Sequence, residues 1–334
     1  MAEIEKDGEE IHSVIDLFSG SGVVSRLFKS KGYEVIANDL ENYARVVSEC
    51  YLSNNDEFDL NTWKEIKEKI ENYPLVTDGV ISTLYAPQDT NNIQKGERAF
   101  YTKENAIKID TYRTAIENVC PDNYKKFFLA PLLSEASIHT NTSGVFKGFH
   151  KDRNTGIGKF GGTKGNALER ITGEITLKPP VLSEQNNPYT IYQSDANILS
   201  SQISADVAYL DPPYNQHPYG SNYFMLNVIL KNELPTKISA VSGIVADWNR
   251  SNYNKKAKIH ESLEEVIQNL DVKYILLSYN SEGFLTYDEI IEMMEKYGEV
   301  SVFSTQYNTF RGCRNLNDRD IHVTEYMFLL KKNK

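Results

Sequence analysis

An apolar strand that runs into two consecutive prolines is the feature that most constrains this chain. The run Val207-Ala208-Tyr209-Leu210 predicts a buried strand, and Asp211-Pro212-Pro213-Tyr214 follows it directly. Each proline ring fixes φ at about −65° and removes an N–H donor, so the turn must be stiff and rich in acceptors. Because open α/β sheets bind ligands at the carboxyl ends of their strands, this turn is a candidate site. An ordinary strand-ending turn is the alternative, since Asp and Pro are common turn residues.

The first forty residues predict a strand, a glycine loop, a helix and a second strand that ends in an acid. We expect a strand at 14–18, the loop Ser19-Gly20-Ser21-Gly22, a helix at 23–29 and a strand at 33–37 before Asn38-Asp39. Glycines let a backbone approach a ligand closely, and an acid after the second strand can accept from ribose hydroxyls. The loop lacks the third glycine of a dinucleotide-binding motif, because residue 25 is Ser. A tight turn that binds no ligand therefore stays an alternative.

Together these two segments resemble the S-adenosylmethionine-dependent DNA adenine-N6 methyltransferases of the D12 (Dam-like) class, over most of residues 13–331. Phe18-Ser19-Gly20-Ser21-Gly22 is similar to the F-x-G-x-G cofactor loop of that family, and residues 211–214 match its DPPY motif fully. Residues from 309 to 330 are similar to its terminal hairpin. The resemblance implies an α/β, Rossmann-like methyltransferase fold, with a mixed, mainly parallel sheet flanked by helices and an inserted DNA-recognition region.

The resemblance also implies roles for individual residues. The catalytic set would be Asp211, Pro212, Pro213 and Tyr214. The cofactor S-adenosylmethionine would be bound by Asp16, Phe18, Ser19, Gly20, Gly22, Asp39, Leu40, Asp195 and Ala196. No metal site is expected.

Methylation of an adenine amine requires hydrogen-bond acceptors, and the proline turn contains such acceptors. The exocyclic nitrogen is a poor nucleophile because its lone pair is delocalised into the ring. Acceptors aimed at its two N–H bonds, here Asp211 and the Pro212 carbonyl, favour a pyramidal nitrogen that can attack. The methyl donor must lie in line, and the base must leave the duplex and stack, here on Tyr214. Neither a metal nor a covalent nucleophile is required.

The first residue of the tetrapeptide favours one substrate over others. In related enzymes Ser often stands there for cytosine N4, and Asn for ribosomal RNA or protein glutamine, whereas Asp211 indicates adenine in DNA. Cytosine-N4 or RNA methylation stays the nearest alternative. A DNA-binding subunit with impaired catalysis is the alternative of another class.

Composition narrows the setting. The chain has 334 residues, which suits one large domain or two, and a net charge of −10 argues against DNA binding driven by bulk charge. Three cysteines without metal-ligand spacing fit a reducing cytoplasm, where we expect the protein to work. No apolar run approaches membrane-spanning length, and the acidic residues 1–10 do not resemble a signal peptide.

A basic, glycine-rich segment interrupts the predicted sheet. We expect residues 1–60 and 186–334 to form the catalytic domain and 61–185 an inserted target-recognition region, with helices at 62–73 and 103–119. Between residues 139 and 180, seven Lys or Arg face three acids. The candidate DNA contacts there are Lys147, Lys151, Arg153, Lys159 and Lys164. A solvated surface loop is the alternative, and the aromatic stretch after Tyr214 is a second candidate surface.

One departure from the family concerns the start of the chain. Family members begin with a motif containing Lys and Gly that helps hold the methionine part of the cofactor, and residues 1–10 do not match it. We therefore expect a truncated chain, or a partner chain that supplies the motif. The other expected partners are double-stranded DNA and, by analogy, a cognate restriction endonuclease.

Overall fold

The computed structural model describes residues 4, 6, 8–162, 165–308 and 322–333. The chain divides into two compact units. We call the first the sheet unit: Met1–Asn55, Leu182–Pro218 and Arg250–Lys334. The second is the helical unit: Asp56–Val181 and Tyr219–Asn249.

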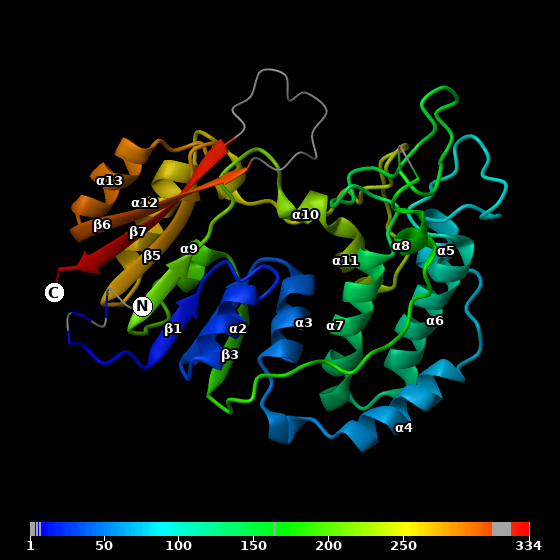
Figure 1. Cartoon of the computed structure of the whole chain (residues 1–334), viewed down its shortest axis with the longest axis horizontal. Coiled ribbons are helices and arrows are strands. Elements are labelled where there is room, and N and C mark those ends of the chain that lie inside the picture. Colours follow the sequence, from blue (N-terminus) through cyan, green and yellow to red (C-terminus); the bar gives the residue numbers. More distant parts are fainter. Residues whose placement is uncertain (1–3, 5, 7, 163–164, 309–321, 334) are drawn as a thin grey trace. The chain divides into compact units, whose positions relative to one another are not determined.

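The sheet unit contains one seven-stranded sheet in the order β3-β2-β1-β4-β5-β7-β6 (Figure 1). Strand β7 runs antiparallel to β5 and β6, and the other neighbours are parallel. The strands are β1 (Ser13–Asp16), β2 (Glu34–Asp39), β3 (Tyr189–Gln193), β4 (Val207–Leu210), β5 (Tyr274–Asn280), β6 (Gly298–Asn308) and β7 (His322–Lys332). The predicted mixed, mainly parallel sheet is thus confirmed. Because the chain steps outward from β1 to β3 and then returns to β4, the order reverses between β1 and β4, which is where open sheets bind ligands.

Helices cover both faces of this sheet. On one face, Ile15, Leu210 and Leu277 pack with buried residues of α9, α12 and α13. On the other face, Val14 and Val207 pack with Phe28 of α2. The helices of the unit are α2 (Val23–Ser30), α3 (Asn42–Tyr51), α9 (Ala196–Leu199), α12 (Ile259–Asn269) and α13 (Tyr287–Glu295), with a 3₁₀ turn η2 (Asn252–Asn254). Alternation along each strand therefore fixes which side chains face α2.

The terminal hairpin closes the sheet as β6 and β7, which pair along their whole length. Its first strand begins at Gly298, before the segment that the sequence suggested. Residues 309–321 of that predicted hairpin lie outside the described residues.

The helical unit is built around aromatic side chains. Its helices are α4 (Leu60–Glu71), α5 (Val80–Leu84), α6 (Lys103–Val119), α7 (Asp122–Ile138), α8 (Leu168–Thr172), α10 (Tyr219–Asn222) and α11 (Phe224–Lys231), and the 3₁₀ turn η1 (Asn55–Glu57) lies at its boundary. Trp63 stacks on Phe128 with ring centres 5.1 Å apart, and its indole N–H donates to the Phe127 carbonyl at 3.2 Å. The apolar run that contains both phenylalanines is therefore part of the core of this unit.

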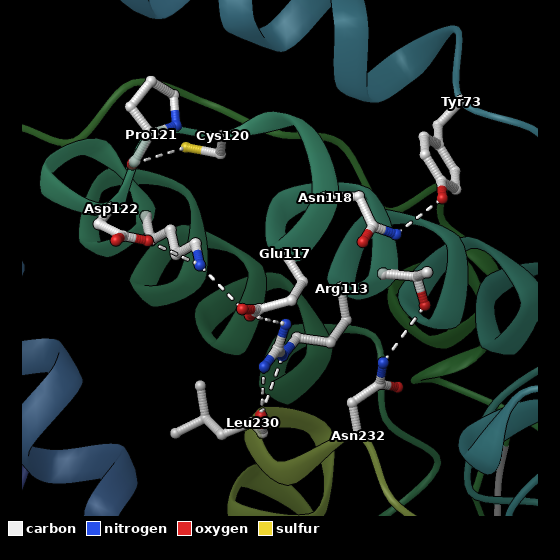
Figure 2. Close-up of polar contacts among 11 residues, drawn as sticks. Tyr73, Arg113, Glu117, Asn118, Cys120, Pro121, Asp122, Leu230 and Asn232 are labelled. Carbon is white, nitrogen blue, oxygen red and sulfur yellow. Dashed lines mark hydrogen bonds and ion pairs between the residues drawn. The ribbon is translucent and has the colours of Figure 1, made fainter.

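The second segment of the helical unit corrects the expected domain boundaries. Residues 219–249 were expected in the catalytic domain, but they belong to the helical unit. Arg113 of α6 donates from Nε and Nη2 to the Leu230 carbonyl of α11 at 2.9 and 2.8 Å (Figure 2). Asn232, which caps α11, donates to Thr114 at 3.3 Å. Phe224 is fully buried beside Phe100, so packing with α6 decides where the segment belongs.

Candidate functional site

The glycine loop after β1 turns tightly and leaves space above its backbone. Gly20 and Gly22 have φ of 50° and 72°, in the left-handed region that favours glycine. The Ser19 N–H donates to the Asn38 carbonyl at 2.8 Å, which ties the loop to the end of β2. A Cβ built on Gly20 would meet nothing closer than the Phe18 carbonyl at 4.0 Å. A ligand can therefore lie directly against the loop.

Asp39 holds this loop and keeps acceptor capacity. Its Oδ2 accepts from the Gly20 N–H and its Oδ1 from the Glu41 N–H, both at 2.8 Å. Burial raises the pKa of Asp39 from its ordinary value, and the backbone N–H bonds lower it. Because each carboxylate oxygen has two lone pairs, one on each remains for a ligand hydroxyl. Leu40 follows, half-buried.

Asp16 is a buried carboxylate with an oxygen to spare. Its side chain is 1% exposed, and Oδ2 accepts from the Ser25 hydroxyl at 2.6 Å. Among the described residues, Oδ1 has no hydrogen-bond partner. Burial, with smaller contributions from Asp39 and Asp211, raises the pKa of Asp16 to about 7. An unpartnered buried acceptor of this kind indicates a missing donor.

The segment after β3 reaches the same edge of the sheet. Asp195 caps the short helix α9 by accepting from the Asn197 N–H at 2.9 Å. The Asn197 side chain accepts from the Tyr253 hydroxyl at 3.0 Å, and the Tyr253 ring meets Phe18 edge-on at 5.0 Å. Ala196 is buried in the same core. Tyr253, which sequence reasoning missed, thus links the glycine loop to the segment at 195–197.

The proline turn follows β4 directly, and all four residues of that strand are buried. The Asp211 side chain reaches solvent, although protein atoms lie close on most sides, and this partial desolvation together with the charge of Glu325 raises its pKa to about 6. Pro212 is buried and Pro213 half-buried. Asp211 is therefore mostly ionised at neutral pH and open to a ligand.

Tyr214 is fixed by its backbone and by its ring. Its carbonyl accepts from the Phe284 N–H at 2.9 Å, and its ring lies edge-on to Tyr279 at 5.8 Å. The next carbonyl, that of Asn215, accepts from the Asn254 amide at 2.8 Å. Half-burial leaves part of the phenol ring available for stacking.

The carboxylates of the site are placed by the alternation of the strands. Asp16 and Asp39 end β1 and β2, and Asp211 follows β4, at the edge where the strand order reverses. In β1, β2 and β4 their neighbours two residues back, Val14, Ala37 and Tyr209, pack toward α2. The three acids therefore belong to the same face of the sheet, and Asp16 senses both of the others.

The basic candidates lie in the helical unit, on an exposed hairpin and the chain that flanks it. Lys151 and Gly158 form an antiparallel bridge, and Asp152 accepts from the Asn154 and Thr155 N–H groups, each at 3.0 Å, to shape the tip. The four described candidates are exposed: Lys147, Lys151, Arg153 and Lys159. Lys164 lies outside the described residues.

These cations form no close ion pairs within the described residues, although the charge of Lys159 helps to lower the pKa of Asp152. No ion pair to Lys147, Lys151, Arg153 or Lys159 within 4.0 Å occurs in the part of the chain that the structure describes. Lys151 places its ammonium 4.8 Å from the centre of the Phe149 ring. The acid nearest in sequence, Asp152, is already used by its own turn.

The described residues contain no group of three or more His, Cys, Asp or Glu side chains arranged to hold a metal ion. None of their helices combines the length and apolarity that crossing a membrane requires.

Comparisons with known proteins agree with this geometry. Residues 1–293 match the family model of the D12 class N6 adenine-specific DNA methyltransferases. The chain is 32% identical to the Type II methyltransferase M.NlaIII of Neisseria lactamica, over 95% of this chain and 90% of that protein. It is 29% identical to the Type II methyltransferase M.CviAII of Paramecium bursaria Chlorella virus 1, over 98% of this chain and 93% of that protein. It also spans about half (49%) of the longer M.FokI of Planomicrobium okeanokoites, at 26% identity. The chain therefore belongs to the D12 class of N6 adenine-specific DNA methyltransferases.

Proposed function

We propose that the protein transfers a methyl group from S-adenosylmethionine to N6 of a flipped-out adenine in a specific double-stranded DNA sequence. The observation that carries this proposal is the set of three carboxylates at the β1–β4 reversal, two beside the glycine loop and one in the proline turn. The positions of the carboxylates suggest their roles. The two beside the glycine loop would bind the cofactor, and the one in the proline turn would bind the target base.

The residues present fit the cofactor. The open space over Gly20 admits a ligand, and the free lone pairs of Asp39 suit ribose hydroxyls. The unpartnered Asp16 oxygen suits a donor such as the cofactor's amino group. Phe18 and Leu40 would flank the adenine ring, with Asp195 and Ala196 beside it, and Ser19 and Gly22 complete the loop. When bound, the cofactor supplies an electrophilic methyl group on a sulfonium.

The proline turn would activate and place the target amine. The Asp211 carboxylate and the Pro212 carbonyl accept the two N–H bonds of the amine, which concentrates the lone pair on nitrogen as it attacks. Pro213 keeps the turn rigid. Tyr214 stacks on the flipped base. The ionised Asp211 carboxylate would take up the proton that the amine loses once it carries the methyl group.

The helical unit would recognise DNA through Lys147, Lys151, Arg153 and Lys159, with Lys164 as a further candidate. Relatives named Type II methyltransferases support a restriction–modification setting, in which a cognate endonuclease cuts the unmodified sequence. Such an enzyme would work in the cytoplasm, where the DNA is.

The test is methylation of mixed-sequence DNA with a labelled methyl donor, followed by identification of the modified base. We expect N6-methyladenine in one sequence context. Asp211→Ala should lower the single-turnover rate by about 10²–10³, the usual loss for one preorganised electrostatic contact. The matched control Asp271→Ala removes an exposed acid far from the turn in sequence and should leave the rate unchanged. Methylation of cytosine or RNA instead, or full activity of Asp211→Ala, would contradict the proposal.

A further inference from the structure

Two polar residues that no motif contains lie beside the proline turn. Asn280 ends β5 and Glu325 stands directly opposite it on β7. The Asn280 side chain is 6% exposed, whereas Glu325 is half-buried. Neither residue belongs to the glycine loop or the tetrapeptide, and the chemistry described above does not use them.

Asn280 connects Glu325 to the catalytic turn. Its amide donates to Glu325 Oε1 at 3.5 Å, and its carbonyl oxygen accepts from the Glu282 N–H at 3.0 Å. Asn280 also lies near the Tyr214 phenol, whose pKa is raised by burial and by the charge of Glu325 and lowered in part by Asn280. Asn280 thus has Glu325 and Tyr214 as neighbours.

Hydrogen bonds hold the backbone on both sides of the Asn280–Glu325 contact. The Ser281 N–H donates to the Thr324 carbonyl at 3.0 Å, and the Thr324 N–H donates to the Ser281 hydroxyl at 3.2 Å. The Phe284 N–H in turn donates to the Tyr214 carbonyl. The loop after β5 therefore fixes the start of β7 and the proline turn to one another.

Strand alternation directs Glu325 toward Asp211. On β7, Leu329 and Met327 pack on the α2 face, so Glu325 belongs to that face. On β4, Val207 and Tyr209 pack there too, and the same alternation carries Asp211 to that side. One strand, β5, separates the two, and Glu325 lies two residues further along the strand direction than the β7 residue level with Asp211, so their backbones are about 12 Å apart. Two carboxylate side chains cover much of that separation.

Titratable groups from several elements surround Asp211. Asp16 comes from β1, Tyr209 from β4 and Tyr214 from the turn itself, and each of them senses the charge of Asp211. Burial is the main cause of the raised pKa of Asp211, and the charge of Glu325 on β7 is the second cause. The same charge also raises the pKa of Tyr209 and of Tyr214. From β5, the groups nearest in register are Ser278 and Asn280, which are uncharged.

We propose that Glu325, held by Asn280, is a positioning residue for methyl transfer: its negative charge keeps Asp211 a strong acceptor for the N–H bonds of the target amine. This inference rests on the proposed function. A like charge nearby disfavours ionisation and makes a carboxylate more basic. A more basic carboxylate accepts a hydrogen bond, and then a proton, more strongly. At the same time Asn280 orients the Tyr214 phenol that borders the base.

The test compares the pH dependence of wild type and three variants. Single-turnover methylation is measured with saturating cofactor and DNA, and the carboxyl carbon of Asp211 is titrated by ¹³C NMR in the protein alone. In Glu325→Gln, we expect the acid limb of the rate and the Asp211 titration both to move to lower pH, by on the order of one pH unit. The rate at high pH should fall several-fold. Glu325→Asp keeps the negative charge, so the acid limb of its pH–rate profile should match that of wild type. In Asp211→Asn the titrating carboxyl signal should be missing, which assigns that signal to Asp211.

Two results would overturn the inference. One is a Glu325→Gln protein whose Asp211 titrates as in wild type; the other is a rate that falls by the same factor at every pH, as for a purely structural role. If Glu325→Gln does not fold, Asn280→Ala tests the same idea, because releasing Glu325 should shift Asp211 in the same direction by less. A wild-type protein that methylates no adenine would instead refute the proposed function, while the titration of Asp211 would still report on Glu325.

Discussion

A single buried carboxylate carries much of the energetic cost of this site. The rise in the pKa of Asp16 from 3.8 to about 7 means that ionising it inside the fold costs about 4 kcal/mol more than in the unfolded chain. The unfolded chain ionises first, so the free energy of unfolding falls as pH rises from about 4 through about 7. Such a cost is retained where function needs a poised acceptor.

Asp16→Asn should therefore stabilise the protein at high pH. The amide keeps the size of the side chain and a partner for Ser25 but removes the charge. We expect the free energy of unfolding to rise by up to about 4 kcal/mol at pH 8 and to change little at pH 4, measured by urea denaturation. Equal effects at both pH values would show that the pKa of Asp16 is the same in the folded and the unfolded chain.

Asp39→Ala should weaken cofactor binding. Losing a charge-assisted hydrogen bond to ribose typically costs about 1.5–3 kcal/mol. Calorimetry with S-adenosylmethionine measures this change, and DNA affinity without cofactor should be unaffected. Asp271→Ala is again the matched control. Unchanged cofactor affinity in Asp39→Ala would remove Asp39 from the proposed site.

At this scale, the apolar patterns predicted the positions of Asp39 and Asp211 at the ends of their strands. Asp16 was expected inside a strand at 14–18, whereas β1 ends at Asp16. The roles of these residues stay predictions. Sequence reasoning missed Tyr253 and Glu325, because each meets the site only through partners far along the chain.

At the scale of elements, the salt dependence of DNA binding can test whether the hairpin around Lys151 contacts DNA phosphates. Changing Lys151, Arg153 and Lys159 to Gln should weaken DNA binding and reduce the log–log salt slope by about 0.9 for each true phosphate contact. Cofactor binding should be unchanged, since the proposed cofactor residues lie in the sheet unit.

A matched control exists in the same unit. Changing Lys64, Lys67 and Lys69 of α4 to Gln removes the same charge from a helix whose buried side is Trp63, Ile66 and Ile70. If both triple variants lose the same salt slope, the hairpin has no special role. If neither does, the DNA surface must lie elsewhere, for example on the aromatic residues Tyr219 and Tyr223, which stack on each other.

The elements themselves were well predicted where apolar patterns were strong. The strand at 207–210 and the helix at 103–119 have the bounds that the sequence suggested. The compact units place α11 in the helical unit, whereas the expected boundaries put it in the catalytic domain. The apolar face of α11 suits any core, and the Arg113 contact that decides its place joins residues far apart in sequence. A local pattern contains no information about that partner.

Taken as a whole, the molecule separates its two proposed ligands between its two units. We expect hydrogen–deuterium exchange to show this separation. S-adenosylhomocysteine, the product of the cofactor, should protect amides at 17–22 and 39–41, whereas DNA should protect those at 147–159. Protection of 147–159 by S-adenosylhomocysteine alone, without any at 17–22, would contradict the assignment.

The centre of the sheet has a kinetic consequence. Strand β1 pairs with β4, and Asp206 accepts from the Ser13 N–H across 193 positions of sequence. During synthesis, β1 and β2 emerge and must wait while residues 56–181 are made before their central partner exists. Closing so long a loop is slow because its entropy must be lost before the contacts form. The β1–β4 edge therefore cannot form before residues 207–214 have been synthesised, and a nascent chain stalled before β4 has no proline turn with which to act.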